Sequence, residues 1–328
     1  MPTMNSHDVR FFSGQSHREL AVEIAEYLSI PLEVTNFGRF SNDNMFIQLG
    51  SSVRGRSVYI VQSLIKPVSD HLMELLIMMD IARGAGAREI HAIIPYYSYA
   101  RSDKKDRPRI SITARLVADL MQTAGVSHVM TMTLHSPQVH GFFSVPTDPL
   151  TARPLFVRHF SQKKFNLEDT IVVAPDMGRA NTAARFAARL GLTFAAAEKQ
   201  RISDTEVRIT STITKNVKGF RRALIYDDEI ATGGSVIKLS KLLVATGIKE
   251  IAVICTHGLF TRNALQHLTS IPEINDIVTT NTVPIPMENR PPQLKVITVA
   301  SIFGEAIWRN YKQKSIGDLF TYSEEKYE

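Results

Sequence analysis

The sequence is poor in cysteine and has no long hydrophobic run. Cys255 is the only cysteine among 328 residues, which excludes a disulfide framework and a zinc site built from cysteines. No run of about 18 apolar residues occurs, so the sequence predicts no membrane-spanning helix and no membrane partner. The first residues, MPTMNSHDVRFFSG, lack the basic and then apolar pattern of a signal peptide. We therefore expect a cytoplasmic protein.

Dense clusters of charge are also scarce. Hydrophobic residues make up 44% of the chain and charged residues 21%, a balance typical of a globular protein and not of a disordered one. The formal net charge is +6, but the basic residues are spread along the chain and DKKDRPR is their one dense run. A spread positive charge favours small anions such as phosphates over nucleic acid. We expect no nucleic-acid partner.

Apolar runs and helical patterns alternate along the chain. VRFFS, SVYIVQS, EIHAIIPYY, HVMTMTLH, TIVVAPD, RRALIYDD and EIAVICTHG are typical of strands buried on both faces of a sheet. Between them, HRELAVEIAEYL, ITARLVADLMQTAG, ANTAARFAARLG and SVIKLSKLLVATG repeat apolar residues at helical spacing. Strands that alternate with helices form βαβ units with parallel strands. The predicted fold class is therefore α/β, with mainly parallel sheets flanked by helices.

The length and the repeated rhythm predict two domains. A chain of 328 residues suits two domains of about 150 residues each, and both halves show the same alternation, as an internal duplication would. Prolines interrupt the pattern in VPTDPLTARPLF, at Pro146, Pro149 and Pro154. We place one domain in residues 1–149 and the other in residues 150–328, and leave open whether the last ~20 residues pack back on the first domain.

The stretch IYDDEIATGGS, residues 225–235, brings two carboxylates and two glycines together after an apolar strand. Asp227 and Asp228 are expected at the carboxyl end of that strand, where open α/β sheets bind their ligands. Carboxylates about 4 Å apart repel by roughly 4 kcal/mol at an effective dielectric constant of 20. The repulsion within the pair therefore has to be relieved by hydroxyl donors, by a cation, or by separation of the carboxylates into water.

The loop that follows fits a phosphate. Gly233 and Gly234 let the backbone approach an anion closely, and the following helix start offers unpaired N–H groups. Thr232 and Ser235 add hydroxyl donors. The pattern predicts a phosphate on the loop, with ribose hydroxyls and a metal at the aspartates. The alternative is a solvated loop with a helix cap, and a Walker A loop or a GxGxxG fingerprint is excluded.

LIYDDEIATGGS resembles the phosphoribosyl-pyrophosphate-binding motif of type I phosphoribosyltransferases and, more closely, that of ribose-phosphate pyrophosphokinases. Further segments resemble the second family in its order: FFSGQSHRELAVEIAEYL, GRFSN, SVRGRSVYIVQS, HLMELLIMMD, IIPYYSYARSDKKDRPR, LHSPQVHGFF, VAPDMG and TNTVPIP. The resemblance implies two tandem phosphoribosyltransferase-like (Rossmann-like) domains. It also implies transfer of the β,γ-diphosphoryl group of ATP to the 1-hydroxyl of ribose 5-phosphate, with Mg²⁺ required and a hexamer as the expected homo-oligomer.

The resemblance also implies roles for particular residues. His135 alone favours a structural histidine and Asp176 a helix cap, but together they match the family's Mg·ATP ligands. Lys199 and Arg201 would otherwise indicate a solvated basic turn; they match a mobile catalytic loop, where cations meet the charge that develops on the transferred group. The positions that match ATP-binding residues are Phe40, Asn42, Asn44, Arg101, Ser102 and His135.

Two further sets complete the expected sites. The set for the ribose phosphate is Asp227, Asp228, Ala231, Thr232, Gly233, Gly234 and Ser235. Ser52, Arg54 and Ser315 match positions near the family's regulatory phosphate site at subunit contacts. An ordinary charged surface is the alternative for this last set.

Several family positions are changed, and the changes cluster around both substrate sites. The changed positions hold Asn44, Ser102, Thr133, Ser144, Arg179 and Ala231, whereas His135, Asp176, Lys199, Arg201, Asp227 and Asp228 keep the family pattern. Three hypotheses stay open: an active ribose-phosphate pyrophosphokinase, the same transfer to another ribose acceptor such as ADP-ribose, and a non-catalytic regulatory paralogue. A simple phosphoribosyltransferase is a weaker fourth, because it needs only one such domain.

Overall fold

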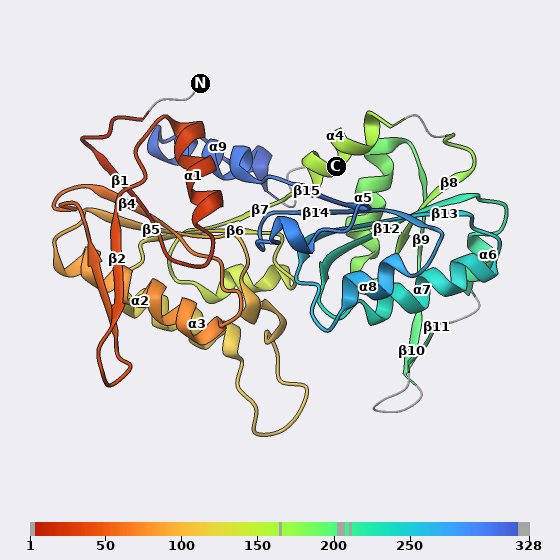
Figure 1. Cartoon of the computed structure of the whole chain (residues 1–328), viewed down its shortest axis with the longest axis horizontal. Helices are drawn as coiled ribbons and strands as arrows, with labels where there is room; N and C mark the ends of the chain where they lie inside the picture. The colour runs from red at the N-terminus through yellow and green to blue at the C-terminus, as the bar shows by residue number, and fades with distance from the viewer. Residues whose placement is uncertain (1–3, 164–165, 202–206, 210–211, 321–328) are drawn as a thin grey trace. The chain divides into compact units, whose positions relative to one another are not determined.

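The computed structural model describes residues 4–163, 166–201, 207–209 and 212–320. These residues form two units (Figure 1). The first unit combines Met1–Thr151 with Thr298–Glu328, and the second is Ala152–Ile297. Each unit has a sheet and a hydrophobic core of its own. Among the described residues, no helix combines the length and the apolar character needed to cross a membrane.

The sheet of the first unit is parallel. Its strands follow the order β1-β4-β5-β6-β7, and each neighbouring pair is parallel. β4 is buried at every position, as expected for an apolar strand with helices on both faces. The strands are β1 (Val9–Ser13), β4 (Ser57–Val61), β5 (Glu89–Ile94), β6 (His128–Met132) and β7 (Thr147–Leu150).

Helices cover both faces of this sheet. α1 packs against α9 on one face, and α2 packs against α3 on the other (Figure 1). Gly304 of α9 faces Tyr27 of α1 so closely that a Cβ would not fit. An antiparallel hairpin of β2 and β3 packs beside α2. These elements are α1 (Arg18–Leu28), β2 (Thr35–Arg39), β3 (Met45–Leu49), α2 (Val68–Gly84), α3 (Thr113–Ala124) and α9 (Ala300–Tyr311).

The sheet of the second unit is also parallel. Its strands follow the order β15-β14-β13-β12-β8-β9. β8 is buried throughout. In β13 only the first residue is partly exposed, and in β12 only the first residue, Asp227 and Glu229 are. The strands are β8 (Thr170–Ala174), β9 (Thr193–Ala196), β12 (Arg222–Ile230), β13 (Glu250–Gly258), β14 (Ile274–Thr280) and β15 (Leu294–Ile297).

Helices again lie on both faces. α4 contacts α5 on one face, and α7 contacts α8 on the other (Figure 1). α5 is strongly amphipathic and buries Phe186 and Ala187 against the sheet side. The helices are α4 (Arg153–Ser161), α5 (Ala180–Leu190), α6 (Thr212–Asn216), α7 (Gly234–Ala245) and α8 (Ala264–Thr269).

One strand is longer than the sequence predicts. The pattern RRALIYDD ends at Asp228, but β12 continues to Ile230 because Glu229 and Ile230 pair with β13. The pairing of β12 with β8, by contrast, stops at Ile225. Asp227 and Asp228 therefore lie within β12, beyond the end of β8, and not at the end of their own strand.

Candidate functional site

The strand order of the second unit reverses between β8 and β12. β9 lies outside β8 on one side, and β13, β14 and β15 follow β12 on the other. Connections that leave a parallel sheet on the two sides of such a reversal diverge to opposite faces, and open α/β sheets bind their ligands at this point. Asp176 follows β8, whereas Asp227 and Asp228 occupy the part of β12 that extends beyond β8. Carboxylates from two distant segments thus belong to one edge of the sheet.

The connection from β12 to α7 turns at Gly233. Its φ of 73° lies in the left-handed region, which glycine adopts without strain, and Gly233 is the N-cap of α7. The helix begins at Gly234, one residue before the predicted start, so Ser235 belongs to its first turn. First-turn N–H groups have no partner within the helix and attract anions. A phosphate at this helix start stays a prediction.

Backbone hydrogen bonds hold the start of this connection. The Ala231 carbonyl accepts a hydrogen bond from the Thr261 N–H at 2.9 Å, and the Ile230 carbonyl accepts from Leu259 at 3.0 Å. Both donors follow β13. The loop that contains Ala231 and Thr232 is therefore anchored to the neighbouring strand's exit, which fixes where the helix start points.

Asp227 and Asp228 share one cation. The Arg179 Nε lies 3.0 Å from Asp228 Oδ1 and 4.0 Å from Asp227 Oδ1. The Asp228 side chain is only 5% exposed, and the side chains of Arg179 and Asp227 are each 14% exposed. Asp227 Oδ1 also accepts a hydrogen bond from the Asp228 N–H at 2.8 Å. Of the ways to relieve two adjacent carboxylates, the structure uses a cation.

The environment of the pair raises the pKa of Asp227. Burial raises the pKa of Asp227 well above its usual range, and the charge of Asp228 raises it further. The Asp228 N–H and the Arg179 guanidinium oppose this rise but do not cancel it.

Asp176 lies where a metal ligand is predicted. It precedes the 3₁₀ helix η3 (Met177–Arg179) as its N-cap, yet its side chain makes no capping hydrogen bond, so capping does not explain this carboxylate. Its carbonyl accepts the Arg179 N–H at 3.2 Å. Within the described ranges, no group of three or more His, Cys, Asp or Glu side chains gathers as a metal cage. The metal role of Asp176 stays a prediction.

The two predicted catalytic cations lie on one short strand. Lys199 and Arg201 are the first and last residues of β10 (Lys199–Arg201), which pairs antiparallel with β11 (Val207–Ile209). This hairpin follows β9 in the second unit. Only the backbone of β10 is described; the side chains of Lys199 and Arg201 lie outside the described part of the structure. Their catalytic role stays a prediction.

The predicted adenine contacts lie at the tip of the β2–β3 hairpin in the first unit. Phe40 is 58% exposed, and its ring meets Phe46 edge-on at 5.8 Å between centroids. The Asn44 N–H donates to Asn42 Oδ1 at 3.3 Å, and Phe40 and Asn44 close the turn through their backbones. An exposed aromatic ring on an ordered turn suits stacking on a base.

The other predicted ATP contacts lie at the carboxyl ends of β5 and β6. Arg101 ends the 3₁₀ helix η1 (Ser98–Arg101) and is exposed. The Ser102 hydroxyl accepts the Thr113 N–H at 3.2 Å, which ties the loop 103–112 to the start of α3. Gln138 in η2 (Pro137–Phe142) donates to Asp103 at 2.6 Å. Since His135 lies two residues before the start of η2, this bond brings the segment of Arg101 and Ser102 beside the segment of His135.

Two of the changed family positions lie around the His135 segment, and the structure gives no reason for threonine at the first of them. Thr133 has φ of 43°, a conformation that is strained for a β-branched residue, and this turn ends β6 at Met132 instead of Leu134 or His135. Ser144 donates its hydroxyl to Gln122 Oε1 at 2.6 Å and so anchors the end of η2 to α3. Both residues hold the backbone around the His135 segment.

The three predicted regulatory residues are exposed in the first unit. The Ser52 carbonyl accepts a hydrogen bond from Arg56 at 2.8 Å, and the Arg54 side chain lies against Gly86. The Ser315 carbonyl accepts from Arg309 at 3.1 Å. These contacts order the backbone around Ser52 and Ser315, and a shared phosphate site stays a prediction.

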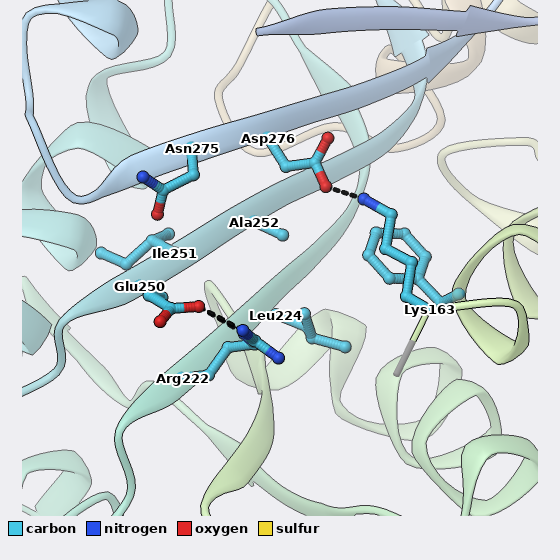
Figure 2. A pocket seen from close by; sticks show the side chains of 9 residues that line it. Lys163, Arg222, Leu224, Glu250, Ile251, Ala252, Asn275 and Asp276 are labelled. Atoms are coloured by element: carbon cyan, nitrogen blue, oxygen red, sulfur yellow. Dashed lines mark hydrogen bonds and ion pairs between the residues drawn. The ribbon is translucent and has the colours of Figure 1, made fainter. Parts of the chain in front are cut away.

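A cavity in the second unit lies at the opposite edge of the sheet from the acidic pair. It measures about 230 Å³ and is lined by residues at the amino ends of β12, β13 and β14. Figure 2 shows its ion pairs, Lys163 with Asp276 and Arg222 with Glu250. Because these charges neutralise one another, the cavity offers no free charge to a phosphate. It is therefore not a candidate for the substrate site.

Comparisons with known proteins cover nearly the whole chain. Residues 9–125 match the family model of the N-terminal domain of ribose phosphate pyrophosphokinase. Residues 204–321 match the model of the phosphoribosyl synthetase-associated domain. The two models match the two ends of the chain separately, one on the side of the predicted ATP residues and one on the side of the acidic pair.

Similar proteins align over their full length. A Streptomyces coelicolor protein is 47% identical over 313 residues, which are 95% of this chain and 98% of the relative. The ribose-phosphate pyrophosphokinase of Deinococcus radiodurans is 43% identical, over 94% of this chain and 97% of that protein. The crystal structure of phosphoribosylpyrophosphate synthetase from Mycobacterium smegmatis superposes with a TM-score of 0.84 at 34% identity, over 93% of this chain and 99% of that one.

Proposed function

The chain belongs to the ribose-phosphate pyrophosphokinase family, and we propose that it transfers the β,γ-diphosphoryl group of ATP to the 1-hydroxyl of ribose 5-phosphate. The products are AMP and phosphoribosyl pyrophosphate. The observation that carries the proposal is the acidic pair on β12 followed directly by the glycine turn and the start of α7.

The acceptor fits the second unit. The vicinal hydroxyls of a ribose match Asp227 and Asp228, which are adjacent and share one cation. The 5-phosphate matches the turn Thr232–Gly233 and the first turn of α7, where first-turn N–H groups and the hydroxyls of Thr232 and Ser235 would meet an anion. Sugar hydroxyls and phosphate are thus recognised by neighbouring parts of one connection.

The donor nucleotide fits the first unit. Phe40 would stack on adenine at the hairpin tip, with Asn42 and Asn44 at the base edge, while Arg101 and Ser102 would meet the polyphosphate beside His135. Phosphoryl transfer depends on position and charge neutralisation more than on covalent chemistry by the protein. The donor site therefore needs cations on ordered loops. The hydrogen bonds of Ser102 with Thr113 and of Gln138 with Asp103 order these loops.

Mg²⁺ is the metal this chemistry calls for. Bound with a nucleotide, Mg²⁺ takes most of its ligands from phosphates and water and needs only one or two protein ligands. Asp176 fits such a site, because its carboxylate follows β8 at the ligand-binding edge and caps no helix. His135, in the first unit, is the second residue that the resemblance assigns to the metal. When bound, Mg²⁺ would neutralise charge on the transferred group.

Lys199 and Arg201 would complete the neutralisation from β10. Both are cations on a hairpin that follows the sheet edge of the acidic pair. Exclusion of water from the site matters as well, because water competes with the sugar hydroxyl for the diphosphoryl group.

The test is to incubate the purified chain with ATP, Mg²⁺ and ribose 5-phosphate and to follow AMP by chromatography. We expect AMP and phosphoribosyl pyrophosphate in equal amounts, and much less of both from a Lys199→Ala variant. Formation of AMP no faster than in that variant would refute the proposal. Replacing ribose 5-phosphate by ADP-ribose in a parallel reaction measures acceptor choice, since the changed residues Arg179 and Ala231 lie beside the acceptor site.

Three further properties are part of the proposal. We propose a cytoplasmic homo-oligomer, a hexamer in the family's usual form, and expect analytical ultracentrifugation to give its mass. A regulatory phosphate near Ser52, Arg54 and Ser315 would make the activity depend on inorganic phosphate. An Arg54→Gln variant should lose that dependence while it keeps its turnover at saturating phosphate.

A further inference from the structure

Arg179 reaches the acidic pair from a different strand connection. It ends η3 after β8 and is the N-cap of α5, and its Nε lies 3.0 Å from Asp228 Oδ1. The Asp176 carbonyl fixes the turn by accepting the Arg179 N–H at 3.2 Å. Since β8 pairs with β12 only as far as Ile225, the Arg179 side chain has access to the part of β12 that extends beyond β8.

The contact occupies one of the carboxylate oxygens that the acceptor would use. Asp228 is only 5% exposed while Arg179 lies against it. A ribose hydroxyl has to come within hydrogen-bond distance, about 2.7 Å, of a carboxylate oxygen. The Arg179 Nε already occupies such a position on Asp228. A ribose diol that binds both carboxylates therefore competes with the Arg179 guanidinium for the same oxygen atom.

The pair also explains why an arginine stands there. Two mostly buried carboxylates without a counter-charge would be strongly unfavourable. Arg179 supplies that charge, and its guanidinium opposes the rise in the pKa of Asp227. Removal of the guanidinium would thus take this partner from Asp228.

We propose that Arg179 is an internal ligand of the acidic pair that the ribose diol of the acceptor displaces, so that this displacement limits how tightly the acceptor binds. The inference rests on the proposed function for the identity of the acceptor. Arg179 acts through Asp228 and is a specificity-determining and positioning residue, not a catalytic one. Its effect falls on acceptor affinity and not on the transfer step.

The experiment is a calorimetric titration of the purified full-length chain with ribose 5-phosphate, without ATP, at pH 8.5. Arg179→Met removes the guanidinium and keeps the length of the side chain. A charge-assisted hydrogen bond no longer has to be broken, so we expect the Kd to fall about tenfold. Arg179→Lys keeps the charge and loses the Nε contact, and its Kd should lie between the two. Arg189→Met, an exposed arginine on the same helix α5, is the control and should leave the Kd unchanged.

A Kd for Arg179→Met at pH 8.5 that equals or exceeds the wild-type value would overturn the inference. If that variant does not fold, Arg179→Lys carries the test, and a Kd no lower than that of the wild type is then the refuting result.

The failure of the proposed function looks different. If the proposed function is wrong, the wild-type protein itself neither forms AMP nor binds ribose 5-phosphate. That result would refute the inference as well. A wild type that binds ribose 5-phosphate and forms AMP, with an Arg179→Met variant that does not bind more tightly, would refute the inference and leave the proposed function standing.

Discussion

A buried histidine should make the first unit sensitive to acid. His91 in β5 is only 5% exposed, stacks on Tyr59 at 4.3 Å between ring centroids, and shares a hydrogen bond of 3.1 Å with His128, which in turn contacts Asp148 at 2.8 Å. Burial, and then the neighbouring His128, lower the pKa of His91 from 6.5 to about 4, although Glu89 opposes the shift.

The sign and size of the effect follow from this difference. The unfolded chain takes up the proton near pH 6.5, whereas the folded chain resists it down to about pH 4. The contribution of His91 to stability is therefore complete above pH 6.5 and is lost as the pH falls toward 4. Between pH 8 and pH 5 the loss should be about 2 kcal/mol, and it approaches about 3 kcal/mol below pH 4.

The assay is urea unfolding followed by the fluorescence of Trp308. This residue is the only tryptophan of the sequence and lies on α9 in the same unit as His91, so its signal reports that unit. A His91→Gln variant should be less stable than the wild type at pH 8, and the difference should narrow by about 2 kcal/mol at pH 5. His7→Gln, at an exposed position of the same unit, is the control. Parallel losses in the wild type and His91→Gln would refute the reasoning.

Three shorter predictions concern the site itself. Lys199→Ala and Arg201→Ala should each lower turnover about 100- to 1000-fold and change the free energy of unfolding by less than about 0.5 kcal/mol; normal turnover with a large loss of stability would contradict the assignment. Asp176→Asn should raise the Mg²⁺ concentration needed for half-maximal activity, and an unchanged Mg²⁺ titration would remove Asp176 from the metal site. Thr133→Asn should raise the free energy of unfolding by about 1 kcal/mol, because asparagine tolerates the left-handed backbone better, and urea unfolding would expose the error if stability falls.

The α/β fold could be predicted because its strands are continuous and apolar. VRFFS and EIAVICTHG coincide with β1 and β13. The ends of β6 and β12 could not be predicted in the same way. β6 stops at Thr133 because of a backbone turn, and β12 continues through the polar Glu229 because His257 of β13 pairs with it. The β2–β3 hairpin escapes prediction because its residues are half exposed and only partly apolar.

The candidate site was predictable in its residue types and not in its contacts. Two adjacent aspartates before a glycine turn indicate a ribose phosphate from the sequence alone. Arg179 is the cation at this pair because β8 lies beside β12. No local sequence pattern predicts that these two strands are neighbours. The sequence marks Arg179 only as a departure from the family pattern. The bond between Gln138 and Asp103 likewise depends on the neighbouring positions of β5 and β6.

The order in which the two units can fold follows from the path of the chain. The chain leaves the first unit after Thr151 and returns to it at Thr298. The second unit is therefore an uninterrupted segment inserted into the first. During synthesis at about 5–20 residues per second, α9 leaves the ribosome roughly 10–30 seconds after β7. Until then α1 lacks the helix that packs against it, and apolar surface of the first unit faces the solvent. The second unit, although it is made later than most of the first, can be completed before it.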